Sequence, residues 1–232
     1  MDALPSAAVS EFDPAAHVTC SSCHATDSQF DSATANRDLR RYHRKGPDAP
    51  TRAIVRAVRA IALPAGGTLL DIGGGVGAIH HLLLERDFTQ ARQVDASAAY
   101  LAVAAAEASR IGHRELVEFL HADFGAVADD VPAADLVTLD RVVCCDPDYA
   151  RLLGPAATHA RRALALSYPR PRLLVRMVVV IVNAMRRLAG RSFRVYLHPP
   201  GAIRAVLERS GLHSKWSGGT WIWAVELFVR EV

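Results

Sequence analysis

Short apolar runs alternate with helical segments through the middle of the chain, and this alternation constrains the fold more than any other feature. Five runs have the length and composition of buried strands: Thr68–Ile72, Ala91–Asp95, Val117–Ala122, Asp135–Leu139 and Leu164–Tyr168. Helical patterns lie among them at Ala78–Arg86, Ala98–Ile111 and Tyr149–Ala163. Such alternation builds β-α-β units, so we predict an α/β fold with a Rossmann-like open sheet, mostly parallel, with helices on both faces.

The flanking segments predict additions at both ends of this sheet. Residues 1–29 lack a sustained period, which predicts a flexible N-terminal tail, and residues 30–63 predict two helices that form an N-terminal cap. The main domain then runs from 64 to 232, with a lid-like insertion at about 170–190. A helix over Pro199–Ser210 precedes two strand-like runs joined by Gly218-Gly219, which predicts a C-terminal antiparallel hairpin.

A glycine-rich loop follows the first predicted strand and opens a helix. Its glycines, Gly73, Gly74, Gly75 and Gly77, permit a tight turn and let a ligand approach the backbone, and Asp71 precedes them. Polar or acidic residues follow the next three strands: Asp95-Ala96, Asp123-Phe124 and Asp140. Open α/β sheets bind ligands at the carboxyl ends of their strands, so we expect these residues to form one site.

Four motifs resemble those of the class I S-adenosylmethionine-dependent methyltransferases: LLDIGGGVG at 69–77, VDAS at 94–97, HADF at 121–124 and ADLVTLDRVV at 134–143. The resemblance covers about residues 54–229 and implies S-adenosyl-L-methionine as the cofactor. It implies that Asp71 orients the loop and the methionine end, that Asp95 holds the ribose hydroxyls, and that Asp123 takes the adenine amino group. The glycines, Ala96, Phe124 and Asp140 complete the implied cofactor site.

A nicotinamide-dinucleotide fold is the main competing interpretation of the loop. Its usual Gly-x-Gly-x-x-Gly spacing would place a glycine where this chain has Ala78. Two segments near the C-terminus, Phe193–His198 and Thr220–Trp223, also resemble the magnesium-protoporphyrin methyltransferases, which esterify a propionate carboxylate. That second likeness rests on few residues and bears only on the type of substrate.

Three residues near the predicted strand ends are candidates for catalytic work. Methyl transfer depends mainly on orientation, and a base is needed only where the acceptor proton has a high pKa. His198 can serve as that base or as a loop or helix-capping residue. Tyr168 can serve the reaction or pack in the core, and Arg141 can bind a substrate carboxylate or pair with Asp140 or Asp146.

The segment Leu173–Arg187 is apolar over most of its circumference and has basic ends. We expect it to be a lid that walls an apolar acceptor pocket with Val179 and Ile181; a dimer interface and shallow contact with a bilayer surface remain the alternatives. The basic segment Phe30–Lys45 is either a solvated helix face or a cap over the cofactor that clamps an acidic acceptor.

Composition and charge restrict the partners. A net charge of +3 is too small to indicate nucleic acid or a membrane surface as the main partner, so we expect a small-molecule acceptor. The longest strongly apolar stretch, Leu173–Met185, is too short to span a bilayer, so we expect no stable membrane insertion, and its apolar character allows a possible homodimer. The cysteines are one Cys-x-x-Cys pair, Cys20 and Cys23, and one adjacent pair, Cys144 and Cys145. The first pair could supply two of the four ligands of a zinc ion, but the adjacent pair does not have the spacing to supply the other two. Without an export-signal pattern, the sequence predicts a cytoplasmic protein that holds no metal.

These observations together predict a methyltransferase that acts on a small, largely apolar metabolite, with O-methylation favoured. The alternatives are a nucleic-acid or protein methyltransferase and a non-catalytic S-adenosylmethionine-binding partner protein. Asp146-Pro-Asp-Tyr149 is only faintly similar to the motif that holds a flipped base, which disfavours a nucleic-acid substrate. The complete glycine loop and its three acids disfavour a non-catalytic role.

Overall fold

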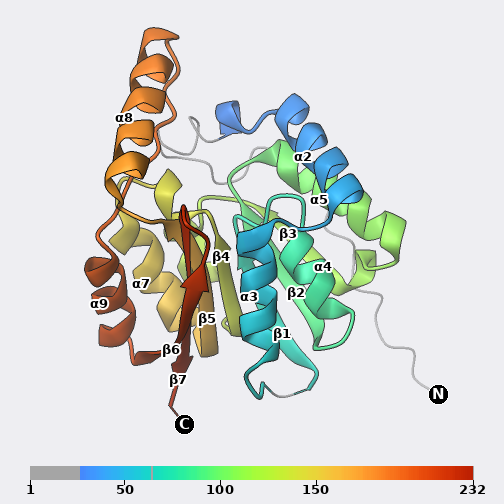
Figure 1. Ribbon diagram of the computed structural model, residues 1–232. Coiled ribbons are helices and arrows are strands. Elements are labelled where there is room, and N and C mark those ends of the chain that lie inside the picture. The colour runs from blue at the N-terminus through green and yellow to red at the C-terminus, as the bar shows by residue number, and fades with distance from the viewer. Residues whose placement is uncertain (1–26, 64, 232) are drawn as a thin grey trace, which may run out of the picture.

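A seven-stranded sheet forms the centre of the computed structural model, which describes residues 27–63 and 65–231 (Figure 1). Its strand order is β3-β2-β1-β4-β5-β7-β6. The strands are β1 (Gly67–Ile72), β2 (Phe88–Asp95), β3 (Val117–His121), β4 (Ala134–Asp140), β5 (Ala160–Pro169), β6 (Leu212–Gly219) and β7 (Trp223–Arg230). Strands β1 to β5 run parallel, and β7 is antiparallel to both β5 and β6. The predicted open sheet and terminal hairpin are confirmed.

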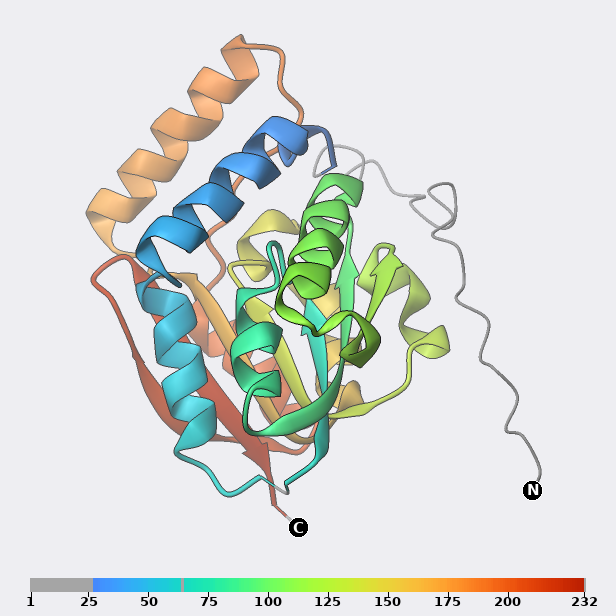
Figure 2. The ribbon, with the colours of Figure 1, turned by 90° about the vertical axis from the view of Figure 1, so that its right-hand side faces the viewer.

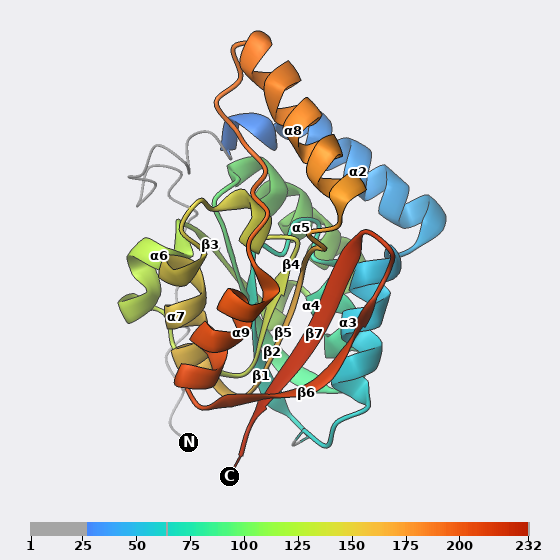
Figure 3. The ribbon, with the colours of Figure 1, turned by 60° about the vertical axis from the view of Figure 1, so that its left-hand side comes forward.

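Helices cover both faces of the sheet (Figures 1 and 3). One face carries α3 (Ala49–Arg59), α4 (Ala78–Leu84) and α5 (Ala98–Ile111), and the other carries α6 (Phe124–Val127), α7 (Tyr149–His159) and α9 (Pro200–Arg209). Short 3-10 turns lie at Arg114–Leu116, Ala128–Asp130 and Val143–Cys145. Each covered face has its own cluster of buried aliphatic side chains, so the sheet is apolar on both sides, as parallel sheets must be.

Two further helices lie at the edge where the parallel strands end (Figures 2 and 3). They are α2 (Ser32–Lys45), which packs on α5, and α8 (Leu173–Leu188), which follows β5. Among the described residues, no helix is long and apolar enough to cross a membrane. The predicted tail lies outside the described residues except for residues 27–29, which are helical.

Side-chain caps fix where several of these helices begin. Asp31 accepts a hydrogen bond from the Thr34 amide at 2.8 Å to start α2, and Ser97 accepts one from the Tyr100 amide at 3.2 Å to start α5. Asp48 caps α3 by accepting from the Thr51 amide at 3.3 Å. Asp48 also pairs with Arg141, which directly follows β4. The residue that begins α3 is therefore also bound to the carboxyl end of β4.

Several predicted boundaries differ from the structure by a few residues, and the largest difference lies between α7 and β5. The helix expected over Tyr149–Ala163 ends at His159, and residues 160–163 already belong to β5. Alanine is a weak strand former, so the composition of this stretch favoured a helix. Pairing overrides that preference: Ala160 lies opposite Ala134 of β4, and Ala163 lies opposite Val229 of β7.

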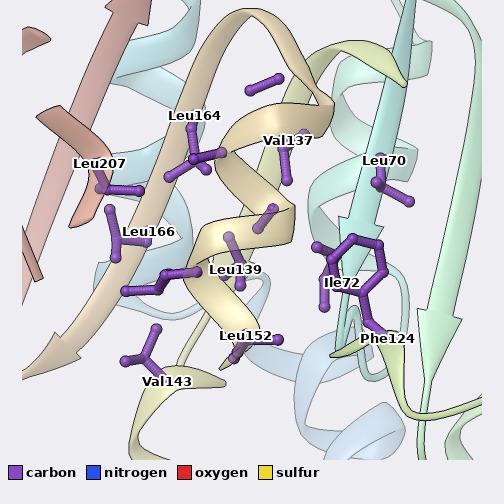
Figure 4. Close-up of a cluster of buried hydrophobic side chains, with 14 of the residues drawn as sticks. Leu70, Ile72, Phe124, Val137, Leu139, Val143, Leu152, Leu164, Leu166 and Leu207 are labelled. Carbon is purple, nitrogen blue, oxygen red and sulfur yellow. The ribbon is translucent and has the colours of Figure 1, made fainter. Parts of the chain in front are cut away.

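The larger aliphatic cluster lies between the sheet and helices α6, α7 and α9 (Figure 4). We expect Leu164→Ala to lower the free energy of unfolding by about 2–5 kcal/mol, because Leu164 has no exposed surface and truncation leaves a cavity. Chemical denaturation measures this change. Leu116→Ala is the control, since Leu116 is 37% exposed and its truncation should cost far less. Equal losses from the two variants would contradict this description of the core.

Candidate active site at the carboxyl edge of the sheet

The loop between β1 and α4 is shaped by three glycines with left-handed backbone. Gly73, Gly75 and Gly77 have φ angles of 63°, 57° and 85°. The Gly73 amide donates to the Val94 carbonyl at 2.7 Å, which ties the loop to the end of β2. Residues with a Cβ rarely adopt this backbone, so the glycine pattern of the sequence is a requirement of the turn itself.

The side chain of Asp71, in β1, packs against the glycine loop at Gly74. Its carboxylate is completely buried and accepts a hydrogen bond from the Thr138 hydroxyl at 2.7 Å, and His80 Nδ1 lies 3.0 Å from its other oxygen. A Cβ added to Gly74 would lie 2.6 Å from that second oxygen, so the loop can settle on the carboxylate only with glycine there. This geometry fits the predicted role of Asp71 in orienting the loop, although Asp71 does not line the pocket.

Asp95 lies at the end of β2, and its side chain is buried. Two backbone amides donate to its carboxylate, Gly75 at 3.1 Å and Ser97 at 2.9 Å. Burial, together with the nearby charge of Asp71, outweighs these bonds and raises the pKa of Asp95 to about 6. A carboxylate can accept about four hydrogen bonds. Asp95 therefore keeps acceptor capacity directed at the pocket that it lines.

Asp123, at the end of β3, begins the short helix α6 and accepts from the Gly125 amide at 3.1 Å. Its carboxylate also pairs with the Arg151 guanidinium at 2.8 Å, and Arg151 pairs in turn with Asp146 at 3.0 Å. Sequence patterns gave no sign of Arg151 at this position. An adenine amino group held by Asp123 would have to share that carboxylate with Arg151.

Asp140 and Arg141, at the end of β4, form an ion-pair network with the start of α3. Arg141 contacts both Asp140 and Asp48, and the Thr51 hydroxyl donates to Asp140 at 2.6 Å. Burial opposes the charge on Arg141, but the two carboxylates outweigh it and raise its pKa. Of the two expectations for Arg141, the structure matches the ion pair with Asp140, with Asp48 in place of Asp146. Among the described residues, Arg141 is the one non-glycine residue with a positive φ angle, 63°.

The strand ends surround a pocket of about 440 Å³, within the usual range for small-molecule sites. Its lining includes the predicted residues Gly73, Gly75, Asp95, Ala96, Asp123, Phe124, Asp140 and Arg141. A smaller adjoining pocket includes Gly74. Gly77 lines neither pocket and instead caps α4. The structure thus brings most of the predicted cofactor residues to one concave surface.

Two of the predicted catalytic residues lie outside this lining. His198 Nε2 lies 2.9 Å from the Asp146 carbonyl, and its ring lies near Tyr149 and Tyr196. Tyr168 is 2% exposed and lines a separate small pocket with Glu226. Burial and Glu226 raise the pKa of Tyr168. These surroundings favour the packing and loop roles that we considered for the two residues.

The pocket also has walls that sequence patterns did not reveal. Phe30 and Phe193 meet edge to face with ring centroids 5.4 Å apart, and Arg186 of α8 lies over the Phe193 ring at 4.9 Å. Tyr100 donates to Asp38 of α2 at 2.6 Å. These contacts join residues far apart in the chain, so periodicity could not show them. The predicted wall of Val179 and Ile181 is wrong: neither lines the pocket, and Ile181 is 54% exposed.

The residues present fit the S-adenosylmethionine that the resemblance implies. The left-handed glycines bring bare backbone to the pocket, Asp95 offers a buried carboxylate for two hydroxyls, and Phe124 offers an aromatic surface beside Asp123. Within the described residues, no group of acidic, histidine and cysteine side chains could hold a metal ion. Cys20 and Cys23 lie outside the described residues.

Comparison with solved structures supports the fold assignment. Magnesium protoporphyrin IX methyltransferase from Synechocystis PCC 6803, with bound SAH, matches with a TM-score of 0.70 and 18% identity, over 90% of this chain and 99% of that one. An O-methyltransferase family 2 protein from Planctomyces limnophilus DSM 3776, in complex with apigenin, matches with a TM-score of 0.62 and 20% identity, over 86% and 62%. At these low sequence identities, the structural matches show a shared fold.

The sheet order, the glycine loop and the carboxylates at the strand ends define a class I S-adenosylmethionine-dependent methyltransferase domain. A family model described as "O-methyltransferase domain" matches residues 22–204. The chain therefore belongs to the O-methyltransferase domain family, whose cofactor is S-adenosylmethionine. A search of curated proteins finds no match.

The Gly73 position tests the loop. In Gly73→Ala, the new Cβ would lie 2.5 Å from Val142 Cγ2 on a backbone that costs alanine about 1–2 kcal/mol. We expect S-adenosylhomocysteine affinity, measured by calorimetry, to fall about tenfold or more. Gly154→Ala in α7 is the matched control, because its Cβ meets nothing within 4 Å. The loop assignment fails if the two variants bind alike.

The raised pKa of Asp95 makes cofactor binding depend on pH. The ionised carboxylate accepts hydrogen bonds from two ribose hydroxyls more strongly than the protonated acid does, so affinity should fall as pH drops through about 6. Asp95→Asn should bind about tenfold more weakly at neutral pH and lose this component of the pH dependence. Calorimetry across this pH range measures both effects.

Protonation of Asp95 does not itself destabilise the free protein over this pH range. A folded pKa raised above the ordinary 3.8 means that the contribution of Asp95 to the stability of the free protein increases as pH falls from about 6. In thermal denaturation without ligand, the stability that the wild type gains from Asp95, relative to Asp95→Asn, should increase as pH falls. Cofactor affinity should decrease over the same pH range. A wild-type protein whose affinity stays constant through this range would refute the assignment.

Proposed function

We propose that this protein transfers the methyl group of S-adenosylmethionine to an oxygen of a small, largely apolar molecule that carries one anionic group. The observation that carries the proposal is the composition of the pocket. Beyond the cofactor residues its lining includes Phe30, Phe193, Val195 and Trp223, and a single cation from α8, Arg186. Such a surface suits an apolar body with one charged end.

Arg186 differs from the other two arginines of the pocket. Arg141 and Arg151 each contact two carboxylates, whereas no carboxylate of the described residues lies within ion-pair distance of Arg186. Burial lowers the pKa of Arg186, and Arg191 and Arg194 lower it further. An anionic group on the acceptor would relieve this cost through a charged hydrogen bond.

The arrangement of ionisable residues bears on the proton of the acceptor. When bound, S-adenosylmethionine supplies an electrophilic methyl group on a sulfonium. No histidine is among the described lining residues of the pocket. We therefore propose that the accepting oxygen is already ionised near neutral pH, as in a carboxylate or an acidic hydroxyl, and needs no protein base. The chain would then contribute orientation, apolar walls and the charge of Arg186.

Arg186→Gln tests the acceptor class. Purified protein and labelled methyl donor would be screened against apolar aromatic acids and their neutral amides, with transfer expected to the acids. For an active acid, Arg186→Gln should raise KM about tenfold or more and leave cofactor affinity unchanged.

Arg187→Gln is the matched control, because Arg187 is adjacent, exposed and outside the lining. Transfer to acids and amides alike, or equal effects of the two substitutions, would refute the anionic acceptor. Cofactor binding without transfer to any acceptor of this class would count against the proposed acceptor, and the cofactor site would still stand.

A further inference from the structure

Helix α8 has an apolar face that the described residues leave exposed. The members of this α8 apolar face are Leu173, Leu174, Met177, Val178, Val180, Ile181, Met185 and Leu188, each between 51% and 89% exposed. Val175 is the one buried residue of the helix. Soluble proteins rarely expose a continuous apolar surface of this kind unless it binds something.

Specific contacts fix which side of α8 faces outward. The Asn183 side chain donates to the Val195 carbonyl at 2.8 Å and accepts from the Val195 amide at 3.0 Å. Val175, Val179 and Arg186 share the side of Asn183 at helical spacing, and Arg186 reaches the pocket. The α8 apolar face therefore points away from the body, and α8 projects beyond the sheet edge (Figure 1).

The turn between β6 and β7 extends this surface at the start of α8. Trp221 and Ile222 in this turn are 52% and 48% exposed. The Arg170 amide donates to the Ile222 carbonyl at 2.7 Å, and the Arg172 guanidinium lies 5.2 Å from the centre of the Trp221 ring. The turn is thus attached to the base of the helix. Tryptophan beside arginine is a pairing that suits the boundary between water and lipid.

The charged residues of α8 and of the chain segments on either side of it are all basic. From Tyr149 to Leu207 the sequence contains eleven arginines and no aspartate or glutamate. Arg172, Arg176, Arg187 and Arg191 are exposed on or beside α8. The basic helix α2, with five of its fourteen residues Arg or Lys, lies at the same edge (Figure 2). A second copy presenting this face would bring two cationic surfaces together without a carboxylate from α8 between them.

We propose that the α8 apolar face and the β6–β7 turn bind the surface of an anionic phospholipid bilayer. Such a surface supplies hydrocarbon for the apolar side chains and negative charge for the arginines. At 16 residues α8 is about 24 Å long, so it lies in the interface and does not span. Arg186, on the opposite side of α8, places the pocket directly behind this surface. The proposal does not depend on methyl transfer.

Co-sedimentation of the full chain with vesicles tests the proposal. We expect binding to phosphatidylcholine vesicles that contain phosphatidylglycerol, and far weaker binding to phosphatidylcholine alone or at high salt. The double variant Leu174→Ser/Ile181→Ser should weaken binding about tenfold or more, because both side chains are over half exposed on the outer face. Arg172→Gln/Arg176→Gln should weaken binding to the anionic vesicles specifically.

Matched control variants distinguish binding through the α8 apolar face from non-specific adsorption to vesicles. Leu116→Ser removes an exposed leucine elsewhere, and Arg209→Gln removes an exposed arginine of α9, so both should bind vesicles as the wild type does. Circular dichroism confirms folding of every variant. The proposal is overturned if the wild type ignores anionic vesicles, or if the controls lose as much binding as the α8 variants. A dimer in analytical ultracentrifugation that Leu174→Ser/Ile181→Ser abolishes, without vesicle binding, would also overturn it.

Discussion

The carboxylate of Asp71 is buried between β1, β4 and α4, and the geometry of the whole site follows from how it is held. Thr138 donates to it from the neighbouring strand, and His80 contacts it from the helix that the glycine loop opens. Loss of either partner would leave a buried charge poorly satisfied, which costs several kcal/mol in typical proteins. Gly74 rests directly on this carboxylate, so the loop, the helix and two strands share one anchor.

The other strand-end carboxylates are balanced in different ways. Asp123 and Asp140 have arginine partners, and the Arg141 network extends to Asp48 at the start of α3. Asp95 is held by backbone amides and keeps a raised pKa. A buried carboxylate without a compensating cation is the one that gains most from ligand hydroxyls.

Helix α8 illustrates how one element can serve two surfaces. Its inner side carries Asn183, bonded to the Val195 backbone, and Arg186, which reaches the pocket. Its outer side is almost entirely aliphatic. The length of the helix limits the outer side to surface contact, because 16 residues are too few to cross a bilayer. An apolar acceptor and a lipid surface would therefore meet opposite sides of the same helix.

The sequence by itself determined the succession of strands and helices along the chain, the position of the glycine loop and the carboxylates that follow the strands. These features are local: each depends on a period, a required φ angle or the residue that follows a strand. Tertiary structure decided the partners of Arg141 and Arg151, the location of Tyr168 and His198 outside the pocket, and the outward face of α8. Those outcomes depend on which distant segments meet, such as Phe30 with Phe193, and on strand pairing that turns residues 160–163 from predicted helix into β5. A periodic pattern records which side of a helix is apolar, but the contacts of Asn183 with Val195 decide whether that side faces the protein or its surroundings.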